Sequence, residues 1–155
     1  MQTHRFFRPL FALCALALLL SLATRARADE LDDDMVQYMR AIRSGDVHVF
    51  LRFLSPENNW RFVSYRAGTS NIVSTTSFSY EETSEQLNQR GGLYSALFDG
   101  TDRYRYSERL ARHPLSSWRR TDTTYRLPDS EGISFVHWKR DGERWVIDSI
   151  GDDSP

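Results

Sequence analysis

The stretch ISFVHWKRDGERWVIDSIG, residues 133–151, decides the fold that we predict for this chain. Two apolar runs flank Asp141-Gly142, and an Asp-Gly pair between alternating runs is among the strongest short signals of a β-hairpin. TTYRL at 123–127 precedes it, separated by a turn over 128–132. The three segments predict a three-stranded antiparallel meander from about residue 118 to 150.

A two-residue loop at Asp141-Gly142 predicts which residues of the hairpin face each other. Trp138 then faces Trp145, and Val136 faces Ile147. We expect this apolar face to pack on the core because side chains of a strand alternate between its two faces.

The opposite face of the hairpin carries the candidate chemistry of the chain. His137 and Asp148 become diagonal neighbours there, and such positions lie about 7–8 Å apart between Cα atoms. A carboxylate can orient an imidazole and shift its proton affinity, which a general acid or base requires. The same pair can instead be a surface ion pair of little energetic value, and a one-residue change of register removes it.

The N-terminus has the three regions of a secretory signal peptide. Arg5 and Arg8 precede the apolar run PLFALCALALLLSLA, and Ala26 and Ala28 form the small-x-small pattern of a cleavage site. The run is shorter than the roughly 20 residues of a membrane span. We therefore expect cleavage after Ala28, no stable membrane anchor afterwards, and a periplasmic or secreted protein.

Removal of residues 1–28 of the 155 leaves a domain of 127 residues, 29–155. Four arginines and no acid are lost, which leaves 16 basic against 21 acidic residues, a net charge of −5. The sole cysteine, Cys14, is also lost, so no disulfide can form and the domain must depend on its apolar core. All but one of the 20 basic residues are arginine, which is typical of a GC-rich bacterial genome, so one domain of bacterial origin is expected.

The rest of this domain shows helical and strand patterns in alternation. Apolar residues at helical spacing predict helices over 31–43 and, after an N-cap at Asp46, over about 47–54. Ser79 and Glu82 form a capping box that predicts a helix over 80–90, closed by Gly91-Gly92. Strands are expected at 60–66 and 102–109, a loop or weak strand at 67–77 and one helical turn at 93–98.

Several kinds of site are disfavoured by the residues present. Without cysteine the domain has no thiol nucleophile, and its three histidines, His48, His113 and His137, are too far apart for the usual zinc motifs. Arginines beside tyrosines at 102–109, and Arg119-Arg120, suggest nucleic acid, but the negative charge and the expected export argue against it. We expect no metal, no cofactor and no nucleic acid.

Two terminal segments resemble the nuclear transport factor two-like (cystatin-like) superfamily. MRAIRSGDVHVFLRFLSP at 39–56 is similar to its paired N-terminal helices, and FVHWKRDGERWVIDSIG at 135–151 to its closing hairpin, with a W-x-I-x-x-I pattern. The resemblance implies an α+β fold in which N-terminal helices pack on a curved antiparallel sheet to form a cone. Residues 67–117 have no counterpart in it.

The resemblance implies two functions, because the superfamily contains both enzymes and non-enzymatic binding domains. The first is an exported accessory domain that binds a small molecule or an envelope protein; the alternative is a small lyase or isomerase with His137 and Asp148 as catalytic groups. Phe135, Trp60 and Tyr65 are the expected ligand-binding residues of a cone-shaped pocket. An inhibitor or interaction protein of the envelope is a third reading, and a homodimer is expected by analogy.

Overall fold

The computed structural model describes residues 30–66, 71–98, 112–128 and 133–154. The chain divides into two compact units, residues 1–33 and 34–155. In the first, residues 30–33 are helical; the description below concerns the second. The predicted signal peptide, the strand at 102–109 and most of the turn at 128–132 lie outside the described residues.

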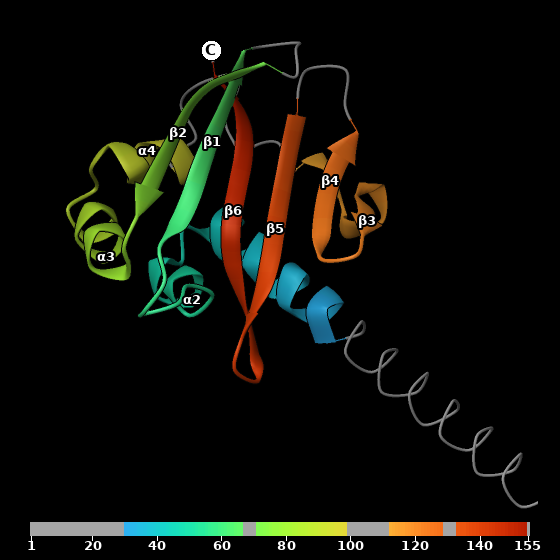
Figure 1. Cartoon of the computed structure of the whole chain (residues 1–155), viewed down its shortest axis with the longest axis horizontal. Coiled ribbons are helices and arrows are strands. Elements are labelled where there is room, and N and C mark those ends of the chain that lie inside the picture. The colour runs from blue at the N-terminus through green and yellow to red at the C-terminus, as the bar shows by residue number, and fades with distance from the viewer. Residues whose placement is uncertain (1–29, 67–70, 99–111, 129–132, 155) are drawn as a thin grey trace, which may run out of the picture. The chain divides into compact units, whose positions relative to one another are not determined.

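The described part of the second unit contains a six-stranded sheet with the order β2-β1-β6-β5-β4-β3. Neighbouring strands run antiparallel, except that β1 and β6 are parallel (Figure 1). The strands are β1 Trp60–Arg66, β2 Ile72–Phe78, β3 Arg119–Thr121, β4 Thr124–Pro128, β5 Ile133–Asp141 and β6 Arg144–Ser154. The mixed α+β class predicted from the sequence is confirmed.

The helices α2 (Val47–Leu51) and α3 (Tyr80–Asn88) begin at the residues that the sequence predicts. Residues 30–44 are helical, and Gly45 turns the chain with a φ of +68°. The Asp46 carboxylate accepts a hydrogen bond from the Val49 amide, 3.0 Å away, and caps α2 (Val47–Leu51) as predicted. This helix ends three residues earlier than its apolar stripe indicates.

The capping box at Ser79 is also confirmed. The Ser79 hydroxyl accepts from the Glu82 amide, and the Glu82 carboxylate accepts from the Ser79 amide, so both donors at the start of α3 (Tyr80–Asn88) are satisfied. These hydrogen bonds lower the pKa of Glu82. The short helix α4 (Gly92–Leu97) and a 3₁₀ turn (Leu115–Ser117) complete the described helical segments.

The hairpin loop lies one residue later than predicted. Asp141 faces Arg144, so Gly142 and Glu143 form the loop. A loop over Asp141-Gly142 would need positive φ at both positions, but only Gly142 has it, at +62°. Glycine at the first loop position is typical of a type II′ turn. The predicted pairs are therefore wrong: Trp138 faces Ile147, and Trp145 faces Arg140.

A β-bulge changes the second half of β6. Trp138 faces Ile147 while His137 faces Ser149, so Asp148 is an extra residue without a partner of its own in the ladder. A bulge reverses the alternation of faces beyond it. Ile150 consequently faces Val136, on the face predicted for the core, although the sequence pattern assigned it to the opposite face.

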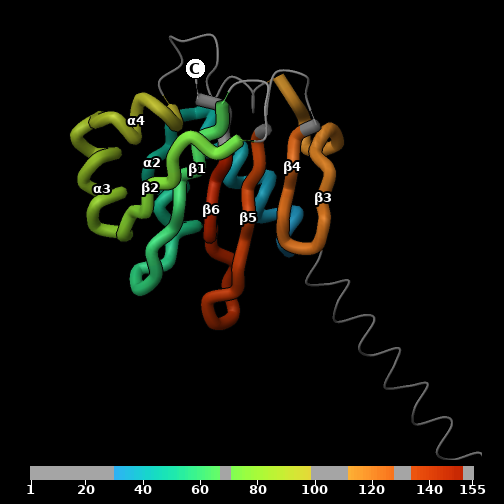
Figure 2. The backbone as a smooth tube through the Cα atoms, turned by 45° about the horizontal axis from the view of Figure 1, so that its top comes forward, coloured from blue at the N-terminus to red at the C-terminus, as the bar shows by residue number. Residues whose placement is uncertain are grey.

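One face of the sheet packs on the helices. Residues 34–44 pass behind β5 and β6 (Figures 1 and 2), and the buried Trp138 ring meets Tyr38 of that helix edge-on, with centroids 5.8 Å apart. Phe53 meets Trp138 at 5.5 Å, and Phe50 of α2 meets Trp60 at 6.1 Å. We call this the helix-covered face and the other the open face.

Candidate functional site

The open face carries a carboxylate surrounded by three basic side chains. Asp148 Oδ2 accepts a hydrogen bond from Arg61 Nη2 at 2.5 Å and lies 3.3 Å from His137 Nδ1, while Asp148 Oδ1 lies 3.3 Å from Lys139 Nζ. The bulge places Asp148 among these groups. We call Arg61, His137, Lys139 and Asp148 the Asp148 cluster.

The cluster keeps Asp148 ionised. Burial alone raises the pKa of the carboxyl, but the hydrogen bonds and positive charges of Arg61 and then Lys139 outweigh that effect, so the pKa lies below its ordinary value. The Asp148 side chain is 17% exposed, whereas Arg61 is 53%, His137 39% and Lys139 32% exposed. The basic groups therefore remain accessible around a largely covered anion.

A second row of the open face continues the basic surface across β3, β4 and β5. Arg119 faces Arg126, and Arg126 faces Phe135, in register. The Arg126 guanidinium lies over the Phe135 ring, 5.6 Å from its centroid, and Tyr65 meets that ring edge-on at 6.2 Å. Arg119 and Arg126 are both exposed.

The Phe135 ring packs against the backbone of Gly151 on β6, where a side chain would not fit. A Cβ at Gly151, which faces Phe135, would lie 2.1 Å from Phe135 Cε1, closer than any real contact. Phe135 therefore lies between Arg126 on the neighbouring strand and the Asp148 cluster, whose member His137 is two residues further along β5.

The described open-face side chains have an excess of positive charge. By strand register this face also holds Asp141 paired with Arg144, and Asp153 beside Tyr65. Its described positions therefore carry five basic and three acidic residues, an excess of two positive charges with His137 neutral, on a chain whose net charge is −1: Arg61, Arg119, Arg126, Lys139 and Arg144 against Asp141, Asp148 and Asp153. The neighbouring positions in the same rows are serine and threonine: Thr75, Ser77, Thr121, Thr124 and Ser149. Such a surface attracts anionic groups.

The structure separates the residues that the sequence suggested for one site. His137, Asp148, Phe135 and Tyr65 lie on the open face. Trp60 lies on the helix-covered face, where its Nε1 donates to Thr83 Oγ1 at 2.8 Å and its ring packs on Phe50. Trp60 is a core residue and cannot line a site with the other four.

The contact between His137 and Asp148 has a different origin from the one expected. The predicted diagonal required the wrong loop position; the observed contact arises from the bulge at Asp148. Neither residue lines the two cavities described below. A cation-bound carboxylate with a lowered pKa is poorly suited to accept or deliver a proton near neutral pH.

Sequence reasoning missed Arg61 as a member of the cluster. The alternation in WRFVSYR places Arg61 on the opposite face from Trp60, and that signal was available. The parallel pairing of β1 with β6 sets Arg61 opposite Ser149, next to Asp148. Arg61 and Asp148 are 87 positions apart along the chain. A local sequence pattern cannot predict a pairing between strands so far apart along the chain.

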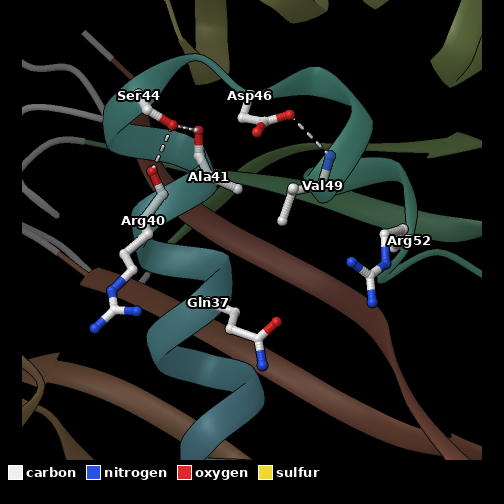
Figure 3. A pocket seen from close by; sticks show the side chains of 7 residues that line it. All are labelled: Gln37, Arg40, Ala41, Ser44, Asp46, Val49 and Arg52. Carbon is white, nitrogen blue, oxygen red and sulfur yellow. Dashed lines mark hydrogen bonds between the residues drawn. The ribbon is translucent and has the colours of Figure 1, made fainter.

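Two cavities lie near α2. The first, of about 220 Å³, is a notch between the 34–44 helix and α2 (Figure 3). The Ser44 hydroxyl on its rim donates to the Arg40 carbonyl, and Asp46 caps α2. The second, of about 410 Å³, is lined by His48, Leu51, Arg52, Leu54, Pro56, Tyr80 and Arg144. Arg52 lines both.

The described residues show neither a group of three His, Cys, Asp or Glu side chains placed to hold a metal ion nor a helix long and apolar enough to cross a membrane. Comparison with models of known protein families finds no match to this chain, and no curated protein matches it.

Proposed function

We propose that this chain is an exported, non-enzymatic binding domain whose open face binds an acidic protein surface. The observation that carries the proposal is the charge of that face, where Arg61 and Lys139 hold Asp148 and the exposed Arg119 and Arg126 lie side by side, so that basic residues outnumber acidic ones. Export rests on the signal-peptide pattern and cleavage after Ala28.

The fold proposed is the cone-like, cystatin-like architecture of the nuclear transport factor two-like superfamily. Three observations support it: helices separated at Gly45-Asp46, their packing on one face of the sheet, and a long closing hairpin next to β1. In this arrangement the Asp148 cluster lies outside the cone, on the face away from the helices.

Binding fits the geometry better than catalysis. A lyase or isomerase site would hold His137 and Asp148 in an enclosed apolar pocket, where desolvation tunes proton affinity. Here the His137 side chain is 39% exposed, and Asp148 is neutralised by Arg61 and Lys139. Exposed arginines instead suit recognition of anionic partners, because a guanidinium binds a carboxylate in a planar, bidentate manner.

The partner proposed is an acidic protein rather than a second copy of the chain. Two copies meeting through this face would bring two basic surfaces together, and like charges facing each other oppose association. An acidic partner would place carboxylates over these arginines and over the exposed side of Arg61.

Fluorescence anisotropy with a labelled poly-glutamate peptide tests the proposal. We expect binding at low ionic strength that weakens steeply at about 0.5 M salt, where the Debye length falls to a few ångströms. Replacing both Arg119 and Arg126 by glutamine should weaken binding by about tenfold, since each exposed charge pair contributes up to about 1 kcal/mol.

The matched control is Arg40→Gln, which removes an exposed arginine of the N-terminal helix. An equal loss of binding free energy per removed charge in Arg40→Gln and in the Arg119/Arg126 variant would show that only net charge matters and would refute the proposed face. Tighter binding to duplex DNA than to poly-glutamate, with the same dependence on Arg119 and Arg126, would replace the acidic protein by nucleic acid.

A further inference from the structure

We propose that the cavity of about 410 Å³ beside α2 binds a small organic molecule that carries a carboxylate. This cavity shares Arg52 with the notch in Figure 3, and the inference does not depend on the open face. Its volume lies within the range of about 300–1,000 Å³ that is usual for ligand sites.

Three basic side chains converge on this cavity. His48 and Arg52 come from α2 and its C-terminal cap, and Arg144 comes from the first residue of β6, about ninety positions later in the chain. No aspartate or glutamate lines the cavity among the described residues. On a chain with a net charge of −1, this is a local positive site that favours anions.

The two arginines differ in how firmly they are held. Arg144 Nη2 donates to the Leu54 carbonyl at 3.3 Å and lies 3.8 Å from Asp141 Oδ2, so one end of its guanidinium is anchored and the rest is half exposed. Arg52 has no side-chain partner in the described part of the chain, and it also lines the notch (Figure 3). Arg52 is therefore available to a ligand.

The rest of the lining is apolar. Leu51, Leu54 and Pro56 form it together with the ring of Tyr80, the first residue of α3. A wall of this kind contacts a hydrocarbon or aromatic body, while the arginines hold the acid. Inorganic phosphate has no such body, so it should bind more weakly than an aryl carboxylate.

Isothermal titration calorimetry with phenylacetate and its neutral counterpart phenylacetamide tests this inference. We expect phenylacetate to bind and phenylacetamide to bind at least about tenfold more weakly. The affinity for inorganic phosphate should also be lower than that for phenylacetate. Arg52→Gln should weaken phenylacetate binding by about tenfold, because it removes a charged partner without disturbing any described contact. Arg144→Gln should have a similar effect.

Arg40→Gln, which alters the neighbouring notch but not this cavity, is the matched control and should bind phenylacetate as the wild type does. Equal binding of acid and amide, no detectable binding of phenylacetate, or a loss in Arg40→Gln as large as in Arg52→Gln would each overturn the inference. Because neither Arg119 nor Arg126 lines the cavity, their replacement should leave phenylacetate binding unchanged.

Discussion

Replacing Asp148 by asparagine keeps the shape of the side chain and removes the charge that holds the Asp148 cluster together. The carboxylate accepts from Arg61 at 2.5 Å and lies 3.3 Å from both His137 and Lys139. A hydrogen bond to a charged group contributes about 1.5–3 kcal/mol when covered, and an exposed pair about 0–1 kcal/mol. Arg61 is half exposed, so we expect a loss of about 1–2 kcal/mol in the free energy of unfolding at pH 7.

The pH dependence distinguishes this explanation from a simple packing defect. Because the pKa of folded Asp148 is lowered, its contribution to stability is complete above the unfolded-state pKa of about 3.9 and is lost as the pH falls through the folded pKa. Urea unfolding of wild type and Asp148→Asn should therefore differ at pH 7, and the difference should shrink as the pH falls through the lowered pKa of folded Asp148.

Asp141→Asn is the matched control for this experiment, since Asp141 lies on the same hairpin and its ion pair with Arg144 is 3.8 Å long. It should change stability by less than about 0.5 kcal/mol. A difference between Asp148→Asn and wild type that is the same at pH 7 and at the lowest measurable pH would refute the electrostatic reasoning, as would no difference at pH 7.

Two further predictions concern packing. Gly151→Ala should lower the free energy of unfolding by about 1–3 kcal/mol because its Cβ would displace the Phe135 ring. In a Phe135→Ala background most of that loss should vanish. Additive losses of the two substitutions in urea titrations would contradict the contact. Trp60→Phe should destabilise more than Trp138→Phe by about 1 kcal/mol, because the Trp60 N–H is hydrogen-bonded in the core while the buried Trp138 N–H has no partner among the described residues; thermal unfolding of both variants checks the order.

Local signals in the sequence were sufficient for elements whose hydrogen bonds close within a few residues. The cap at Asp46 and the box at Ser79 and Glu82 appear as predicted, because each joins groups three positions apart. The alternation around Trp138 likewise predicted its burial, since side chains of a strand alternate whatever its partner is.

The candidate site depended on contacts that no local pattern encodes. The sequence pattern predicted that His137 and Asp148 lie on one face. Their contact, however, depends on a loop that begins at Gly142 and on the bulge at Asp148. The partner strand of β6 was open from sequence, because many strands could pair there with similar local energy.

The amino-acid sequence by itself therefore determined the α+β class, the caps and the apolar side of the closing hairpin, through interactions between near neighbours. Only the tertiary structure decided that β1 runs parallel to β6, which brings Arg61 to Asp148 and turns a His–Asp pair into a basic surface. It also set Trp60 in the core instead of the site. Such pairings depend on burying the apolar surface of the whole domain at once, and that is a property of the assembled fold.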